Sequence, residues 1–335
     1  MSDSPYNKEF DFSEIKAALL NPETPFPASL LYFFSDISPE DLNKLSKVWP
    51  QVQTLRRRGL LEDMEVLAEG DTILYFDSFA LHCLEDEDPV TRATAIRLLW
   101  QSEQESLVPR FIKLMEEDPE SIVRAAAATA LGVFAYMGEL EEITESTYQL
   151  LLKHLIRTHL GGDDPLVRRR ALESLGYSSH ADVPRLIQEA YESDDEEWLQ
   201  SALFAMGRSV DQRWAEPVLR MIEHPDLQVR YEAVRAAGEL ELQDARDLLF
   251  DLLEEGTDDN DLYYAAIWSL TKIGGKGVRS LIEAAIEDTD DPDDLQLLEE
   301  ALENLDFTEQ YNLFDMMRFE EDDPEDWDLD DDFED

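Results

Sequence analysis

The chain of 335 residues has few basic side chains, since 28 Lys and Arg stand against 78 Asp and Glu, and its formal net charge is −50. A field of this sign repels phosphate backbones and anionic lipid headgroups, and it attracts basic proteins. The composition therefore argues against binding of nucleic acid or of an anionic membrane by the molecule as a whole. One open alternative is that the chain is an acidic decoy. In this alternative, the negative charge on the outer, convex face of the molecule binds a basic protein.

Cysteine, histidine and long apolar runs are also scarce. The single cysteine, Cys83, excludes an internal disulfide and lies in the apolar stretch FALHCL, where we expect a buried thiol. The five histidines include no pair at i,i+4 spacing, so no structural metal site is expected. No signal-peptide pattern and no uncharged apolar run of about 18 residues is found, so the expected location is the cytoplasm.

The apolar fraction of 43% is that of an ordinary globular protein, so most of the chain can fold despite its charge. The last sixteen residues, EEDDPEDWDLDDDFED at 320–335, contain twelve acids and no base. We predict that this acidic tail is disordered, because it is too charged to bury a core.

A pattern of nine residues recurs seven times along the chain. In RRRALESLG (168–176) an anchor residue is followed by a small or apolar residue at +3, an apolar residue at +7 and glycine at +8, and the glycine is replaced in the copies that begin at residues 92, 263 and 298. Acidic or Asp-Pro turns precede most copies, and apolar residues at three- and four-residue spacing lie between them, so each period predicts a helical hairpin. The seven anchors are Arg92, Arg124, Arg168, Leu199, Arg230, Tyr263 and Leu298.

The repeat, seen best in DDPLVRRRALESLG (163–176), resembles HEAT repeats, particularly the short bacterial subtype also found in phycobilin lyases. The resemblance implies an all-α, right-handed α-solenoid of about seven helical hairpins, in which the second helix of each pair lines the concave face. It also implies a ladder between neighbouring repeats, in which a turn Asp binds the anchor Arg. Leu199, Tyr263 and Leu298 would interrupt this ladder.

Four regions follow from the repeats and the charge. We predict an N-terminal helical cap over residues 1–71, with Ser38-Pro39-Glu40-Asp41 as a helix start, and the repeat solenoid over 72–307. A C-terminal capping helix is predicted over 308–319, and the acidic disordered tail over 320–335.

Sequence motifs for catalysis and cofactors are incomplete. GGKG (274–277) lacks the first Gly and the Ser or Thr of a phosphate-binding loop, and it predicts a turn between repeats. DTDDPDDLQLLE (288–299) lacks the central glycine of a calcium loop and predicts a helix cap. No His-Glu dipeptide is present, although the HEAT-repeat enzyme deoxyhypusine hydroxylase binds iron through such pairs. We therefore predict no catalytic residue, no cofactor and no metal.

The second helices have a predicted outward stripe at positions +1, +2, +5 and +9, because positions −1, +3 and +7 are apolar. In repeats three to six this stripe is poor in acids and rich in arginine and aromatic residues, as protein-binding hot spots are. Alternatively, these aromatic residues pack on neighbouring repeats and the arginines pair with nearby glutamates. The predicted partner-binding residues are Arg169, Arg170, Gln200, Phe204, Arg208, Tyr231, Arg235, Tyr264, Trp268 and Lys272.

These observations predict a non-catalytic scaffold or adaptor whose concave face binds a protein segment with acidic and apolar residues. The acidic tail is itself a candidate occupant, because Trp327, Leu329 and Phe333 stand among aspartates. A HEAT-type lyase or enzyme subunit that acts on a bound chromophore or protein is an alternative, as is the acidic decoy. Neither nucleic acid nor a membrane is an expected partner, and the oligomeric state is left open.

Overall fold

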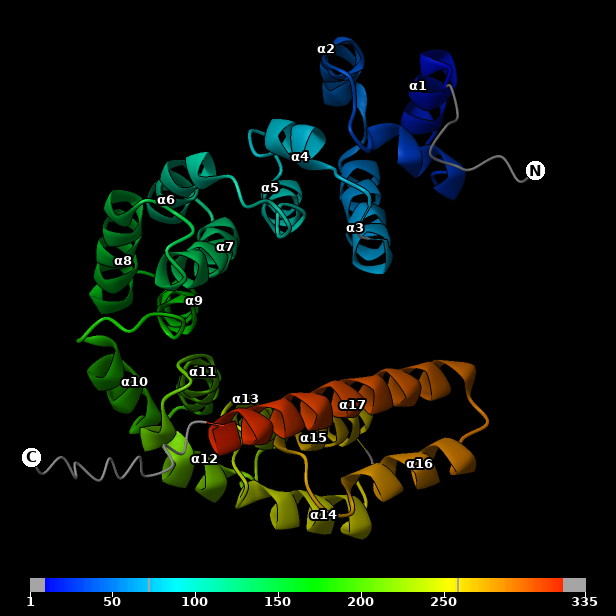
Figure 1. The fold of residues 1–335 in the computed structure, drawn as a ribbon. Helices are drawn as coiled ribbons and strands as arrows, with labels where there is room; N and C mark the ends of the chain where they lie inside the picture. Colours follow the sequence, from blue (N-terminus) through cyan, green and yellow to red (C-terminus); the bar gives the residue numbers. More distant parts are fainter. Residues whose placement is uncertain (1–9, 72, 258, 322–335) are drawn as a thin grey trace, which may run out of the picture. The chain divides into compact units, whose positions relative to one another are not determined.

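The computed structural model describes residues 10–71, 73–257 and 259–321, and it describes the side chains of these residues except for 255 and 311–321. All regular elements in these ranges are helices, so the predicted all-α solenoid of helical hairpins is confirmed. The chain divides into two compact units, Met1–Ser193 (unit 1) and Asp194–Asp335 (unit 2). Figure 1 labels the helices of both units.

Unit 1 stacks its second helices in chain order, because α3 contacts α5, α5 contacts α7, and α7 contacts α9. The first helices α4, α6 and α8 contact α5, α7 and α9 respectively (Figure 1). The elements are α1 (Phe12–Leu20), η2 (Ala28–Phe34), α2 (Pro39–Val48), η3 (Trp49–Gln51), α3 (Thr54–Gly70), α4 (Asp77–Cys83), α5 (Pro89–Arg97), η4 (Glu105–Leu107), α6 (Val108–Glu117), α7 (Ser121–Glu139), α8 (Glu145–Leu160), α9 (Pro165–Leu175) and α10 (Val183–Tyr191).

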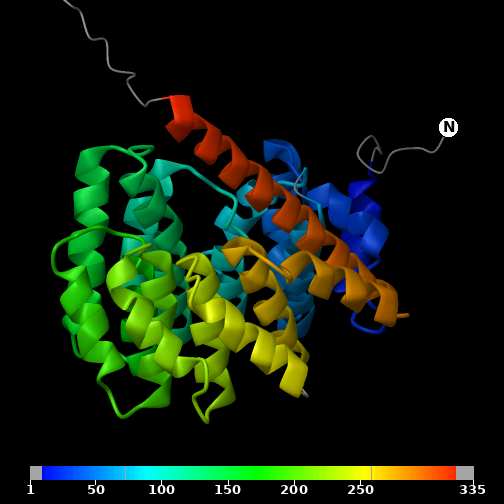
Figure 2. The same ribbon diagram turned by 60° about the horizontal axis from the view of Figure 1, so that its bottom comes forward.

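Unit 2 repeats the same arrangement, because α11, α13, α15 and α17 contact one another in that order. Figure 2 shows α16 and α17, in orange to red, as a hairpin. The elements are α11 (Glu196–Arg208), η5 (Gln212–Trp214), α12 (Ala215–Met221), α13 (Leu227–Glu239), α14 (Ala245–Glu255), α15 (Asn260–Ile273), α16 (Val278–Asp288) and α17 (Pro292–Glu321).

The acidic turns start the second helices by capping them. The carboxylates of Asp88, Asp226 and Asp259 each accept a hydrogen bond from the backbone N–H three residues later, at 2.9, 2.9 and 2.8 Å. Such a cap satisfies an N–H group that has no partner inside the helix. Proline follows at the first helical position of α5 and α9, where its missing N–H costs nothing.

The glycine at repeat position +8 lets consecutive second helices approach closely. A Cβ atom added to Gly238 would lie 2.7 Å from the Cα of Ser269 on the next helix, and one added to Gly207 would lie 3.0 Å from the Cα of Ala236. The residue opposite each glycine is small and occupies position +6 of the following repeat. The Ser269 hydroxyl also donates to the carbonyl oxygen of Val234 at 2.9 Å, which fixes the register of α13 and α15.

An arginine ladder joins neighbouring repeats in unit 1, as the resemblance implied. Arg92 donates two hydrogen bonds to the carboxylate of Asp118, at 2.9 and 2.8 Å, and Arg124 is bound to Asp163 in the same way. Arg92, Arg124 and Arg230 each also donate to the carbonyl oxygen six residues earlier, at 2.8, 2.8 and 3.1 Å, so the anchor arginine of α13 lies against its own turn as those of unit 1 do.

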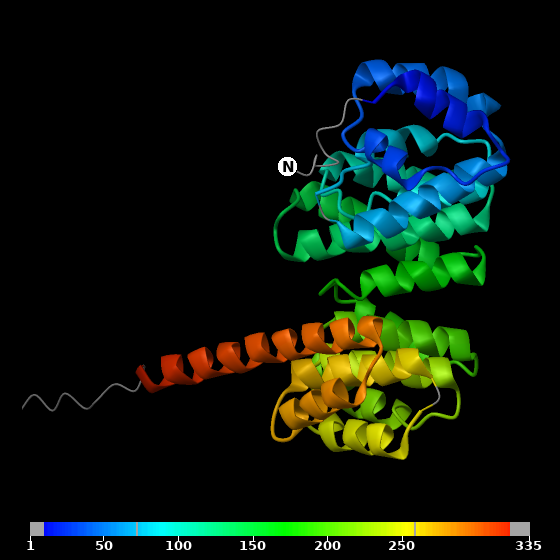
Figure 3. The ribbon, with the colours of Figure 1, turned by 90° about the vertical axis from the view of Figure 1, so that its right-hand side faces the viewer.

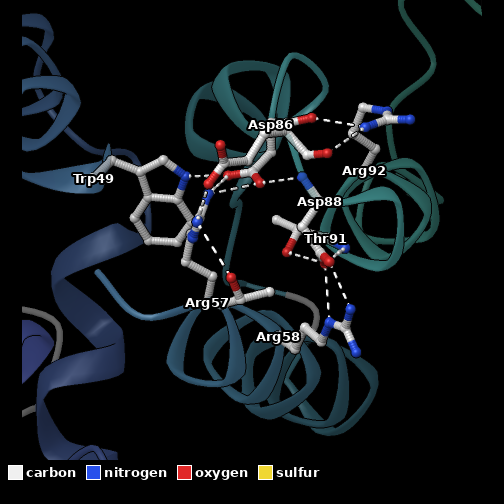
Figure 4. A network of polar contacts seen from close by, with 9 residues as sticks. Trp49, Arg57, Arg58, Asp86, Asp88, Thr91 and Arg92 are labelled. Atoms are coloured by element: carbon white, nitrogen blue, oxygen red, sulfur yellow. Dashed lines mark hydrogen bonds and ion pairs between the residues drawn. The ribbon is translucent and has the colours of Figure 1, made fainter. Parts of the chain in front are cut away.

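The ladder extends into the segment predicted as a cap (Figure 4). Arg57 on α3 donates to both carboxylate oxygens of Asp86, at 2.8 and 2.9 Å, and Trp49 donates its indole N–H to the same carboxylate at 2.6 Å. Beside it, the guanidinium of Arg58 binds Asp88 and lowers the pKa of that carboxyl to about 2. Helix α3 therefore makes the contacts of a repeat second helix, and the boundary at residue 71 stays a prediction.

The C-terminal capping helix predicted over residues 308–319 is the end of a longer helix. Residues 308–319, predicted as a separate capping helix, continue α17 without a break, as Figure 3 shows in orange to red. No proline or glycine occurs between residues 293 and 321, so nothing in the sequence ends the helix earlier. Of the predicted tail, residues 322–335 lie outside the described residues.

Among the described helices, α7 alone is long and apolar enough to cross a membrane by length and composition. Half of its 18-residue apolar window is buried, and α7 contacts α5, α6, α8 and α9. Arg124 near its start is also held by Asp163. These contacts are those of a core helix in a solenoid.

Candidate partner-binding groove

A groove of about 510 Å³ opens beside α13, α15 and α17 of unit 2, and we call it the unit 2 groove. Six of the predicted partner-binding residues line it together: Arg208, Tyr231, Arg235, Tyr264, Trp268 and Lys272. The remaining lining residues are Glu239, Asp261, Ala265, Ile267, Ser269, Leu297 and Ala301.

The repeat period explains why these side chains meet. Positions +1, +5 and +9 of one helix are four residues apart and therefore form a single row along it. Consecutive helices in register place these rows side by side, so the same repeat position lies at the same level on each helix. The three rows are Gln200, Phe204 and Arg208 on α11; Tyr231, Arg235 and Glu239 on α13; and Tyr264, Trp268 and Lys272 on α15.

At position +9, Glu239 bridges two bases on the neighbouring helices. Its carboxylate accepts from Arg208 of α11 at 3.1 Å and from Lys272 of α15 at 2.9 Å. All three side chains are about a quarter exposed. The pairing crosses between helices, so it orders both bases at one end of the groove.

Aromatic rings of these rows lie beside the arginine side chains. The guanidinium of Arg235 lies 5.8 Å from the ring centre of Phe204 and 5.5 Å from that of Tyr231, and Arg208 lies 5.1 Å from Phe204. These distances are those of cation–π contacts. Arg235 also lies 3.5 Å from the carboxylate of Glu232. The pairing of arginines with nearby glutamates, which the alternative expected, is therefore present for Arg208 with Glu239 and for Arg235 with Glu232.

Trp268 differs from the other aromatic side chains of the rows, because it is 42% exposed. Tyr264 beside it is half-buried, and burial raises the pKa of its hydroxyl, with a hydrogen bond to Asp294 as the next cause. The tyrosine therefore stays neutral, and the groove presents a neutral aromatic wall next to Arg235 and Lys272.

The two remaining arginines of the prediction belong to unit 1. Arg169 is only 8% exposed, so the expectation that it projects from the surface is wrong. Its neighbour Arg170 is partly exposed and donates to Glu173 at 2.5 Å, one helical turn along α9. Gln200 and Phe204 are half-buried on α11 in unit 2.

Leu297 and Ala301 of α17 complete the groove, and neither is among the residues predicted from the sequence. Leu297 occupies position −1 of the last repeat, which the helix phase predicted to face the core, yet it is 46% exposed. Its neighbour Leu298 is buried instead. The chain order could have indicated these two residues. Helix α17 is the second helix that follows α15 in the stack, so it borders the same surface.

The described residues contain no group of three or more His, Cys, Asp or Glu side chains that could hold a metal ion. Cys83 is buried, and burial raises the pKa of its thiol well above the ordinary value, so the thiolate form is disfavoured. His82 and His159 have pKa values lowered by burial, and neither lines the unit 2 groove. The groove offers aromatic faces, bases and apolar surface.

Several solved structures are similar to this chain at low sequence identity. Among solved structures, YibA of E. coli is 15% identical, with 85% of this chain and 98% of that chain covered and a TM-score of 0.43. Human deoxyhypusine hydroxylase in complex with glycerol is 15% identical, with 89% and 96% covered and a TM-score of 0.36. The Kap95:Nup1 complex contains a chain that is 11% identical, with 90% and 46% covered and a TM-score of 0.41.

No curated protein matches the chain in sequence. A family model described as HEAT repeats matches residues 78–176, 183–261 and 215–303, which together make up more than half of the chain. The phycobilin-lyase-like subtype stays a prediction. The repeat period, the stacked hairpins and this match agree, and the chain belongs to the HEAT-repeat family.

Proposed function

We propose that this chain is a non-catalytic, cytoplasmic protein-interaction scaffold, and that its unit 2 groove binds an extended segment of a partner protein. The segment carries acidic side chains and at least one bulky apolar side chain. The observation that carries the proposal is the exposed indole of Trp268, which lies in one groove with Arg235 and Lys272. Tryptophan and arginine are enriched among the residues that dominate binding energy at protein interfaces.

The fixed positions of the bases support an acidic segment. Arg235 is held by the rings of Phe204 and Tyr231, and Lys272 is held by Glu239. Side chains that are already ordered lose less conformational entropy when a ligand binds. Three bases and two acids line the groove, so a partner carboxylate meets a local excess of positive charge in a chain of net charge −50.

The acidic tail is one occupant that fits this chemistry. It is covalently attached to the chain, so its effective concentration near the groove can offset the repulsion from the acidic body. If the tail occupies the groove, deletion of residues 320–335 should reduce amide protection along α13 and α15. Unchanged hydrogen exchange there would exclude the tail as the occupant and leave a separate partner.

The partner site itself is tested with the double variant Arg235→Glu with Trp268→Ala. We expect the full-length variant to lose at least about tenfold in affinity, or ~1.4 kcal/mol, for a protein captured from the native host. The matched control is Arg220→Glu on α12, which reverses an exposed charge outside the groove. Retention of every captured protein by the double variant at unchanged affinity would contradict the groove proposal.

An acidic decoy is the second candidate, and the net charge of −50 favours it. A basic protein held by surface charge should dissociate steeply between low and moderate ionic strength, because exposed charges are screened over a Debye length of about 8–10 Å. A segment held by Trp268 and by partly buried bases should lose much less affinity. Titration of the captured complex with NaCl therefore separates the two candidates.

A further inference from the structure

Unit 1 contains a second concave pocket, of about 340 Å³, between α3, α5 and α7. We call it the unit 1 pocket. Trp100, 48% exposed, and Val133, 37% exposed, border it, and the buried side chains of Phe111 and Phe134 also line it. Its volume lies at the lower end of the range of small-ligand sites, ~300–1,000 Å³.

The pocket lies where the repeat carries its bulkiest residue at position +8. Trp100 occupies this position in the first repeat, where four of the other copies have glycine. Helix α5 ends at Arg97 after nine residues, whereas α3 and α7 have 17 and 19. Two of the α7 side chains that line the gap are small, because alanine occupies positions +2 and +6, as Ala126 and Ala130. Helix α5 is short, and the bulky ring of Trp100 follows it in the chain. An apolar opening therefore remains between α5 and α7.

Ser102 provides a second and independent sign of a ligand. This serine lines the pocket and is 5% exposed, and its hydroxyl has no hydrogen-bond partner among the described residues. A buried hydroxyl without a partner costs about 1–3 kcal/mol, so a ligand polar atom that reached it would recover part of this free energy.

The charges at the rim favour a cation beside the apolar group. Arg97 is the one base among the lining residues, and Glu65 binds it at 2.6 and 2.9 Å. The negative charge of Glu62 also stabilises the charged form of Arg97 and contributes to raising the pKa of its guanidinium. Glu69, exposed at the rim, has no hydrogen-bond or ion-pair partner in the described part of the chain. The surroundings of this pocket are therefore acidic, whereas bases outnumber acids in the unit 2 groove.

We infer that the unit 1 pocket binds a bulky apolar side chain of a partner protein segment in which Lys or Arg flanks that side chain. The apolar side chain fills the space between Trp100 and α7, and the flanking cations lie near Glu62 and Glu69. This site is separate from the unit 2 groove and selects the opposite charge, so one chain can hold two segments of different chemistry.

The test uses two short dansyl-labelled peptides, KKFLKK and EEFLEE, and the full-length protein. We expect KKFLKK to bind, as measured by fluorescence anisotropy, and EEFLEE to bind at least about tenfold more weakly. Ala126→Leu, which fills the pocket, and Glu69→Lys, which reverses the rim charge, should each weaken KKFLKK by about tenfold. Thermal unfolding shows whether the Ala126→Leu variant is folded. If that variant is unfolded, the binding of KKFLKK to the surface variant Glu69→Lys tests the inference.

Two controls separate this site from the rest of the molecule. Asp63→Lys makes the same change of charge on α3 at a residue that does not line the pocket, and it should leave KKFLKK binding within about twofold. Arg235→Glu with Trp268→Ala should also leave KKFLKK binding unchanged, because those residues line the unit 2 groove. Equal affinity for both peptides, no binding of either, or equal losses in Glu69→Lys and Asp63→Lys would overturn the inference.

Discussion

Arg57 and Asp86 form a deeply buried ion pair whose side chains are 5% and 1% exposed. Two buried charges do not by themselves imply stability, because both have lost their hydration. Here the carboxylate has further hydrogen bonds, since Asp86 also accepts from the indole of Trp49 at 2.6 Å and from the backbone N–H of Asp88 at 2.8 Å, whereas the Nε of Arg57 is buried without a partner among the described residues. The pair therefore specifies how α3 meets the turn before α5.

Removal of one partner of this pair should be costly. We predict that Arg57→Ala destabilises unit 1 by about 3–5 kcal/mol, because it leaves the carboxylate of Asp86 buried without its cation. Arg185→Ala, which breaks an exposed pair with Glu189, should cost less than about 0.5 kcal/mol. Urea unfolding followed by circular dichroism measures both variants, and similar losses would show that burial of the pair is unimportant.

Helix contacts depend on the small residues that face each other between repeats. Gly207 faces Ala236, and Gly238 faces Ser269, so α11, α13 and α15 approach closely at these positions. Where tryptophan replaces this glycine, at Trp100, a pocket opens in unit 1. The residue at position +8 therefore affects how closely consecutive second helices pack at that level of the repeat.

The close contact of α13 and α15 predicts opposite effects for two glycine substitutions. Gly238→Ala should destabilise unit 2 by about 1–3 kcal/mol, because the new methyl group overlaps the backbone of Ser269 and the helices must separate. Gly59→Ala in α3 has no atom within 4 Å of the new Cβ and should stabilise its helix by about 0.5–1 kcal/mol. Thermal unfolding of both variants measures these changes in stability. An unchanged unfolding temperature in Gly238→Ala would exclude close helix contact as the role of this glycine.

The whole molecule carries a net charge of −50, which repels itself in the folded state. Many of its ion pairs are exposed and contribute little, whereas the ladder pairs Arg57–Asp86 and Arg92–Asp118 are buried and weakly screened. Added salt should therefore reduce the repulsion more than it weakens the internal pairs.

We predict that the unfolding temperature rises as NaCl increases from low concentration to about 0.15 M and then changes little, because at that ionic strength a Debye length of about 8 Å already screens most repulsion between exposed charges. Differential scanning calorimetry at constant pH measures this change. A fall in the unfolding temperature over the same range would mean that exposed ion pairs outweigh the self-repulsion.

Local spacing was sufficient to predict the period, the all-α class and the stripe at +1, +5 and +9. Glycine at +8 and arginine at the anchor are read directly from the chain, and Tyr231, Arg235, Tyr264 and Trp268 line one groove as that spacing requires. These features depend on the 3.6-residue turn of a helix and on the repetition of one hairpin, which are properties of neighbouring residues.

Only the tertiary structure decided which side chains are paired across helices. Glu239 joins Arg208 to Lys272, Arg57 binds Asp86 across 29 residues, Arg169 is buried, and Leu297 faces the groove. The unit 1 pocket likewise depends on where α5 ends relative to α3 and α7. Local spacing determines the face of a helix on which a residue lies, but contacts between helices depend on their separation and register, which are set by packing along the whole stack.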